Sequence, residues 1–407
     1  MPYDLTAESP YYIDHRARVK ELQKAMEKNG IDVYLASRPR TMSFILDAFC
    51  PWRSYLVILS KGDPVLFTFV IDAIRLADET WLPEDCVRAY APMGGMDQIS
   101  AVSGFILEEL GLERGRLGYE DGLSTWTPEG YLSHYEYESF SHALKGFEFV
   151  NSHTLVDAMS VIKDAGTIAR FREASRQVDE GHAAVREALG NGGWKGLTET
   201  VVAGIGALAM RRAGSVSEWN FAGLNELSSG RRTALGACTP PTTRPLGAGE
   251  PLMVDLHSMF RLALGDHSHN YLIGPASAKL RRHADNFVDL VTTVLEAWKE
   301  GSTPSSLAEV MFARAEKLGC SDYVVPGCEH GIGLFGDEWR IGSDSDSPIP
   351  YWTDPDHGYR AGELVICAMQ YAAPEDEAGF RYENPILIGK LGVETLSKYP
   401  LGIEEIV

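Results

Sequence analysis

Three acidic residues and one histidine in the second half of the chain have the side-chain types needed to bind a cation or to move a proton. Asp255 lies in the apolar run LMVDL, and Asp266 follows eleven residues later in GDHSHNYLIG. His330 lies in CEHGIGLFGDEW and Glu383 in FRYENPILIG. A carboxylate inside an apolar strand is costly unless it is paired, hydrogen-bonded or bound to a metal ion. We therefore expect these four residues to share one buried polar site.

The run LMVDLHSMFRLALGDHSHNYLIG predicts a β-hairpin. Strand alternation places Asp255 and His257 on one face of the first strand, and Asp266, Ser268 and Asn270 on one face of the second. Two acids on neighbouring strands can approach a single cation, and like charges that close require a metal ion or a proton. For this pair alone, an exposed Asp beside a turn-forming Asp is an equally open interpretation.

The elements that must position these residues fall into two blocks, as expected for 407 residues. Residues 1–158 alternate helical runs such as YYIDHRARVKELQKAMEKNG with short β-rich runs such as SYLVILS, which predicts an α/β domain. In residues 159–407, pairs of long helices alternate with strand-rich blocks. This second block predicts an α+β domain with an antiparallel sheet and pseudo-twofold symmetry.

Composition limits the classes of partner. Hydrophobic residues make up 44% of the chain and charged residues 23%, which is typical of a globular protein. The net charge of −20 disfavours binding to nucleic acid or to an anionic membrane. The start MPYDLTAESPYYIDHR lacks a basic segment followed by an apolar run, so we expect no secretion signal. No run approaches the roughly 18 apolar residues of a membrane helix. Six Cys without a CxxC pair favour reduced thiols, so we expect a cytoplasmic protein.

The order of the four polar residues resembles the pita-bread family, which includes methionine aminopeptidase, prolidase, aminopeptidase P and creatinase. The metal ligands of that family run Asp, Asp, His, Glu, Glu. The first two are eleven residues apart, as Asp255 and Asp266 are. The His lies in an HGIG-type turn, as His330 does, and the last Glu in an R-x-E strand, as Glu383 does. The resemblance covers residues 160–407, and it implies a pita-bread domain, a creatinase- or prolidase-like N-terminal domain and a homodimer.

The chain departs from this family at three positions. The fourth ligand, a Glu in a TIEP- or SMEP-like strand end, aligns with Met369 in VICAMQYAAP, and a thioether cannot replace a carboxylate for a hard ion such as Mn²⁺. The second His of the family corresponds to Asp337, and an upstream His of creatinase corresponds to Cys238. The resemblance therefore implies either one divalent ion (Mn, Zn or Fe), held by the remaining acids and His330, or a metal-free site that works by acid–base chemistry.

Further residues are candidates for binding the substrate. Arg53, in FCPWRSYLVILS, is similar in context to a creatinase Arg that reaches across the dimer to the substrate carboxylate, which a planar guanidinium binds well. Arg340 falls near a second carboxylate-binding Arg of creatinase. Trp52 would form a pocket wall, and Met369 would line the pocket at the vacant ligand position. The alternatives are surface arginines and a core tryptophan.

Two residues are candidates for catalysis beside His330 and Glu383. Cys238 would be a nucleophile if His330 lowered the pKa of its thiol, and otherwise it is inert packing. Asp337 would be either a general acid or base or a cap in a turn.

Taken together, the residues and the resemblance predict a creatinase-like hydrolase of a C–N bond in a small metabolite that carries a carboxylate. His330 would move the proton, and the three acids would hold one divalent ion that activates water or would bind a cationic nitrogen of the substrate. The alternatives are a metal-dependent Xaa-Pro-type peptidase, a lyase of the dimethylsulfoniopropionate type, in which aromatic residues near Arg53 would hold the sulfonium, and a non-catalytic binding protein.

Overall fold

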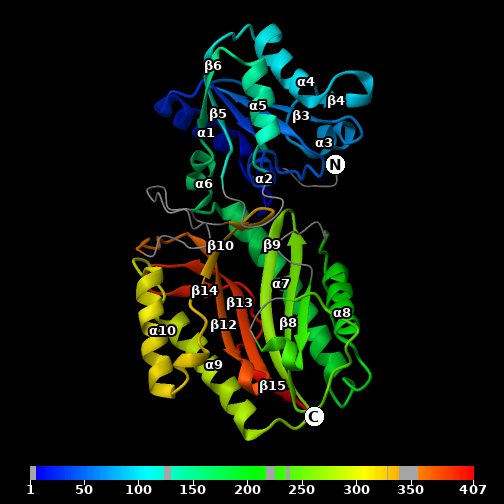
Figure 1. The fold of residues 1–407 in the computed structure, drawn as a ribbon, viewed down its shortest axis with the longest axis vertical. Helices are drawn as coiled ribbons and strands as arrows, with labels where there is room; N and C mark the ends of the chain where they lie inside the picture. Colours follow the sequence, from blue (N-terminus) through cyan, green and yellow to red (C-terminus); the bar gives the residue numbers. More distant parts are fainter. Residues whose placement is uncertain (1–5, 123–129, 217–224, 235–238, 328, 339–355) are drawn as a thin grey trace. The chain divides into compact units, whose positions relative to one another are not determined.

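The structure is a computed structural model that describes residues 6–122, 130–216, 225–234, 239–327, 329–338 and 356–407. The chain forms two compact units, Met1–Val161 and Ile162–Val407, which are drawn as ribbons in Figure 1. The sequence placed the domain boundary after residue 158.

The first unit is built on a six-stranded sheet in the order β4-β3-β2-β1-β5-β6. Its strands are β1 (Val33–Ala36), β2 (Tyr55–Leu59), β3 (Val65–Phe69), β4 (Val87–Tyr90), β5 (Gly115–Tyr119) and β6 (Phe147–Asn151). Its helices are α1 (His15–Asn29), α2 (Pro39–Leu46), α3 (Ala73–Glu79), α4 (Gln98–Gly104), α5 (His134–Ala143) and α6 (Thr154–Ser160). Two separate apolar cores contain alternate residues of the central strands, so both faces of the sheet are covered. The α/β layer predicted from the sequence is confirmed.

Local sequence accounts for the first helix of this unit. The side chain of Asp14 accepts a hydrogen bond from the Ala17 amide and so caps the N-terminus of α1. Gly30 ends the helix in the left-handed conformation, with φ 64°, where a residue without a Cβ is least strained.

The second unit contains two antiparallel sheets with helices. Its helices are α7 (Ala165–Leu189), α8 (Glu199–Arg212), α9 (Ala278–Ala297) and α10 (Pro304–Leu318). Its strands are β7 (Glu226–Ser229), β8 (Glu250–Phe260), β9 (Ala263–Ile273), β10 (Glu329–Gly333), β11 (Gly336–Glu338), β12 (Leu364–Ala373), β13 (Ala378–Ile388), β14 (Val393–Thr395) and β15 (Ile403–Ile406). The sheet orders are β15-β9-β8-β7, in which β15 alone runs parallel to its neighbour, and β11-β10-β12-β13-β14.

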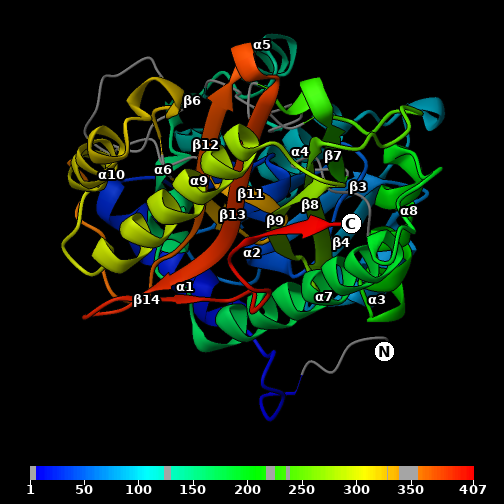
Figure 2. The ribbon, with the colours of Figure 1, turned by 90° about the horizontal axis from the view of Figure 1, so that it is seen from below.

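Each sheet of the second unit has its own helix pair. Helices α7 and α8 pack on β7, β8 and β9, and helix α9, paired with α10, packs on β12 and β13. Figure 2 shows α9 running over the β12–β13 pair. Strand β13 also lies against β9 of the other sheet, so the inner faces of the two sheets meet between the helix layers. This arrangement confirms the α+β class predicted for the second domain.

The predicted hairpin is confirmed as β8 and β9, which pair along their whole length. Its two-residue turn uses Arg261 and Leu262, both with positive φ (46° and 68°), as the tight connection of two right-twisted strands requires. The register sets His257 directly opposite Asp266, and Asp255 opposite Ser268. Directly opposed residues project to the same face of a sheet, so all four belong to one face. Among the described residues, no helix is long and apolar enough to cross a membrane.

Candidate metal centre

The four polar residues singled out by the sequence converge where β8, β9, β10 and β13 meet. The Nε2 atom of His330 lies 3.4 Å from Glu383 Oε1 and 4.0 Å from Asp266 Oδ2. Ligand atoms of these three residues all lie within 4.8 Å of one another. Asp255 reaches the same cluster from β8, and the side chains of all three acids are at most 3% exposed. The predicted convergence on one buried site is therefore present.

Side-chain hydrogen bonds fasten β13 beside β9, although the two strands belong to different sheets. The Nδ2 atom of Asn270 donates to the Arg381 carbonyl at 2.6 Å, and the Arg381 amide donates to Asn270 Oδ1 at 3.2 Å. Ser268 Oγ donates to Glu383 Oε2 at 3.2 Å. The polar face of β9 predicted from the sequence thus positions Glu383 next to the hairpin acids.

Arg381 is a member of the site that the sequence did not single out. Its Nε lies 3.4 Å from Asp255 Oδ2, and its Nη2 donates to Glu383 Oε1. Burial alone would raise the pKa of Glu383, but Arg381 and then His330 outweigh it and hold that pKa well below its usual range. The sequence could have indicated Arg381, because it lies two residues before Glu383 and alternate residues of a strand share a face.

The two hairpin acids, Asp255 and Asp266, are buried and lie among other carboxylates, and both effects raise their pKa values. Burial, followed by the charges of Glu383 and Asp266, raises the pKa of Asp255 well above its ordinary value. Burial and then Glu383 also raise the pKa of Asp266. Carboxylates that are buried, mutually repulsive and within a few ångströms of an imidazole form the donor set of a divalent-cation site. The residues present therefore fit a metal ion.

The hydrogen bond of the His330 ring indicates its tautomer. Its Nδ1 lies 3.0 Å from the Gly331 carbonyl, which can only accept, so Nδ1 carries a proton and donates. This leaves the Nε2 atom, which faces Glu383 and Asp266, as the atom that can hold a cation or exchange a proton.

His257 is a second site residue whose importance the sequence did not show. Its Nε2 lies 3.3 Å from Asp266 Oδ1, and its side chain is 4% exposed. Burial lowers the pKa of His257, but Asp266, with further contributions from Glu226 and Glu383, raises it to about 9. Glu226, on β7 directly opposite Asp255, adds another acid to this edge of the cluster, and burial raises its pKa. The sequence could have indicated His257 by its position two residues after Asp255, on the same face of the strand.

The structure does not bring Met369 to the site. Met369 is paired with Tyr382, is 2% exposed and belongs to the apolar core that α9 covers. Ala368 is the residue directly opposite Glu383, so it projects to the site face. The vacancy predicted at Met369 therefore lies one residue earlier, because a one-residue shift in a strand exchanges the two faces.

Arg53 and Trp52 belong to the first unit, and the Arg53 guanidinium is hydrogen-bonded to other residues of that unit. Its Nε and Nη2 donate to Glu136 at 2.6 and 2.8 Å, and its Nη1 donates to the Gly130 carbonyl at 2.8 Å. Trp52 is 48% exposed, and its ring lies 5.3 Å from that of Phe69. Binding of substrate by Arg53 stays a prediction, and it requires the exchange of one of these bonds.

Three other predicted residues cannot be placed in the site. Cys238 and Arg340 lie outside the described residues. Asp337 is on β11, where its backbone pairs with Ile332, and its side chain lies outside the described part of the chain. The roles proposed for these residues stay predictions.

A cluster of histidines lies on the other face of β9, as the alternation in HSH indicates. The ring of His182, on α7, lies 4.8 Å from that of His267 and 6.0 Å from that of His269. Its Nε2 donates to the His267 carbonyl at 2.9 Å. Burial lowers the pKa of His182 to about 4 although this carbonyl opposes the shift.

The shifted pKa of His182 predicts a loss of stability in acid. Between pH 6.5 and about 4 the unfolded state binds a proton at His182 that the folded state does not bind, so the free energy of unfolding falls as the pH falls through this window. We expect His182 to contribute about 2–3 kcal/mol to the difference in stability between pH 7 and pH 4.5. The measurement is urea unfolding of the wild type and of His182→Gln, whose amide can still donate to the carbonyl, at several pH values. The free energy of unfolding should fall less steeply with falling pH in the variant. An equally steep fall in both proteins would contradict this prediction.

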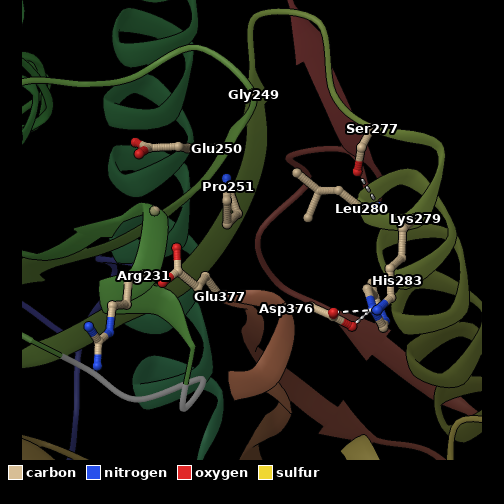
Figure 3. A pocket seen from close by; sticks show the side chains of 11 residues that line it. Arg231, Gly249, Glu250, Pro251, Ser277, Lys279, Leu280, His283, Asp376 and Glu377 are labelled. Atoms are coloured by element: carbon tan, nitrogen blue, oxygen red, sulfur yellow. Dashed lines mark hydrogen bonds and ion pairs between the residues drawn. The ribbon is translucent and has the colours of Figure 1, made fainter.

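A cavity of about 180 Å³ lies elsewhere in the second unit, and none of the predicted site residues line it (Figure 3). Its polar walls include Arg231, Glu250 and Lys279. On one side, His283 and Asp376 point toward each other, with His283 Nε2 2.9 Å from Asp376 Oδ2. Its walls carry both cationic and anionic side chains, and Lys279 pairs with Asp376, so it differs from the carboxylate-rich centre.

Comparison with family models decides the classification. Residues 169–390 match the model of metallopeptidase family M24, and residues 18–162 match the creatinase/prolidase N-terminal domain. The chain belongs to metallopeptidase family M24. The pita-bread resemblance and the predicted two-part fold are therefore confirmed, and the chain is an M24-family hydrolase.

Whole-length relatives of this M24 chain are peptidases by name. It is 21% identical over 383 residues to the Xaa-Pro dipeptidase of Pyrococcus furiosus, covering 94% of the chain and 98% of that protein. The Xaa-Pro dipeptidase of Pyrococcus horikoshii is also 21% identical, over 382 residues, with 94% and 97% covered. The expected creatinase-like hydrolysis of a non-peptide C–N bond is wrong on this comparison. Missing metal ligands in this chain therefore do not indicate a non-peptide substrate, because similarity to the dipeptidases extends along almost its whole length.

Solved structures support the fold. The prolidase from Pyrococcus horikoshii superposes with a TM-score of 0.77 at 20% identity and covers 94% of this M24 chain and 99% of its own. The Xaa-Pro dipeptidase from Bacillus anthracis gives 0.78 at 18% identity, with 97% and 100% covered.

Proposed function

We propose that this M24 hydrolase is a metal-dependent peptidase that cleaves Xaa-Pro dipeptides. The observation that carries the proposal is the convergence of Asp255, Asp266, His330 and Glu383 in one buried site, in a chain that aligns over almost its whole length with Xaa-Pro dipeptidases. A bound divalent cation would supply Lewis-acid polarisation and water activation.

The chain's own residues have separate tasks in this proposal. Arg381 holds Asp255 and Glu383 in fixed orientations and prevents them from repelling each other. The Nε2 atom of His330 would hold the cation or carry the proton, because its Nδ1 proton is committed to the Gly331 carbonyl. Burial of the acids excludes bulk water and strengthens every charge interaction in the site.

The two charged ends of a dipeptide match the acidic and cationic residues that we propose for its binding. A dipeptide carries a carboxylate and an ammonium, and the excess of acids at the site favours the ammonium end. The carboxylate requires a cation, for which Arg53 or Arg340 is our proposal, and the route through Arg53 requires a homodimer. We propose a cytoplasmic homodimer with this substrate.

The test is hydrolysis of Xaa-Pro dipeptides by metal-stripped protein before and after addition of Mn²⁺, Co²⁺ or Zn²⁺, with creatine as a second substrate. We expect chelation to lower the rate about 10²–10⁴-fold, since the ion contributes several kcal/mol. Glu383→Gln should lose this activity. Glu394→Gln is a matched control because Glu394 is exposed and is paired with Arg172. Cleavage that is unaffected by chelation, or cleavage of creatine alone, would overturn the proposal.

A further inference from the structure

The centre contains two overlapping groups of ligand atoms that share Asp266. One consists of Asp266, His330 and Glu383 and lies toward β10 and β13. The other consists of Asp255, His257 and Asp266 and lies on the β8–β9 hairpin, and its ligand atoms also fall within 4.8 Å of one another. We call the second set the hairpin group.

The two groups differ in the side chains that lie next to them and could add a further ligand atom. On the β12 side, Ala368 faces Glu383 and offers no ligand atom. On the hairpin side, His257 adds an imidazole nitrogen directly opposite Asp266. Glu226, opposite Asp255, adds negative charge to the same edge. The chain thus lacks an oxygen ligand on one side and has a nitrogen ligand on the other.

The position of His257 relative to Asp266 fits two ligands of one ion. Its Nε2 lies 3.3 Å from Asp266 Oδ1, and ligand atoms of one tetrahedral ion with bonds of ~2.1 Å are about 3.4 Å apart. Within the described part of the chain, Asp266 Oδ1 accepts no well-directed hydrogen bond, so this carboxylate oxygen is available as a ligand atom. The side chains of His257 and Asp266 are only 4% and 3% exposed, so solvent does not compensate the buried carboxylate.

We propose that His257 is a metal ligand, and that Asp255, His257 and Asp266 hold one divalent cation of the nitrogen-accepting class. An imidazole favours Zn²⁺ or Co²⁺ over Mn²⁺, which an all-carboxylate set would suit. The inference shares two acids with the proposed peptidase site, but it concerns binding of the ion and requires no peptide substrate.

The experiment measures binding of Zn²⁺, Co²⁺ and Mn²⁺ to metal-stripped full-length protein by calorimetry, and the visible spectrum of the Co²⁺ form. His257→Gln should weaken binding of Zn²⁺ and Co²⁺ about 10–100-fold and change the Co²⁺ spectrum. His257→Asp keeps a ligand atom but replaces nitrogen by oxygen, so it should retain binding and shift the preference toward Mn²⁺. His283→Gln, a buried histidine bound to Tyr371 and Asp376, is the matched control and should match the wild type.

Wild-type affinity and an unchanged Co²⁺ spectrum in His257→Gln would overturn the proposal. If that variant does not fold, the ligands of Zn²⁺ are determined instead by X-ray absorption of His330→Gln loaded with one equivalent of Zn²⁺. We expect an imidazole among the ligands, and oxygen ligands alone would overturn the assignment. Zinc binding that depends on His257, in a protein that cleaves no Xaa-Pro dipeptide, would contradict the proposed function and leave this inference standing.

Discussion

Replacing Ala368 by glutamate is expected to raise the affinity for Mn²⁺ about 10–100-fold, whereas the same change one residue later should damage the fold. Ala368 faces Glu383 across the β12–β13 ladder, so Ala368→Glu adds a carboxylate to the site. Met369 is 2% exposed within the apolar core, so Met369→Glu places a carboxylate where nothing compensates its charge. We expect Met369→Glu to lose about 3–5 kcal/mol in the free energy of unfolding and to gain no affinity for metal.

Calorimetry with Mn²⁺ and urea unfolding of the metal-free proteins distinguish these outcomes. Ala372→Glu is the matched control, because Ala372 is on the same strand and face as Ala368 but opposite Gly379, away from Glu383. It should leave Mn²⁺ affinity unchanged. A gain in affinity in Met369→Glu, with none in Ala368→Glu, would show that the β12–β13 register is not the one described.

Arg381→Gln is expected to lower the free energy of unfolding of the metal-free protein by about 3 kcal/mol. Removing one partner of a buried ion pair leaves uncompensated charge, and Arg381 is 12% exposed between two acids that are each 1% exposed. A divalent cation should stabilise the variant more than the wild type, because it replaces the missing positive charge. Thermal unfolding with and without saturating Zn²⁺ should therefore show a larger metal-induced shift in the variant.

The control for Arg381→Gln is Arg172→Gln. Arg172 pairs with Glu394 at 2.7 Å, but the two side chains are 49% and 41% exposed. Exposed pairs contribute little, so this change should stay within about 0.5 kcal/mol of the wild type and leave the metal-induced shift unchanged. Equal losses in the two variants would argue that Arg381 does not balance the site acids.

Much of the fold followed from local pattern. The alternation in LMVDL and GDHSHN predicts a hairpin with its acids on one face, and β8 and β9 have that arrangement. Helical spacing that ends at Gly30 likewise predicts α1. These features depend on residues close together in the chain, where strand and helix periodicity alone decide which side chains share a face.

Function was predicted less well, because absent ligands were weighed more heavily than similarity along the whole chain. The missing carboxylate favoured a creatinase-like reaction, whereas whole-length relatives are Xaa-Pro dipeptidases. A vacancy at one ligand position indicates a change in metal binding, and it does not identify a substrate.

By itself, the sequence determined the composition of the site: two strand acids eleven residues apart, a histidine before a glycine-rich turn, and a final glutamate. Only the tertiary structure decided that Ala368 rather than Met369 faces Glu383, that Arg381 joins Asp255 to Glu383, and that His257 meets Asp266. The physical reason is that strand register and the contact between sheets depend on pairing between distant segments. A shift of one residue in that pairing moves a side chain from the site to the core.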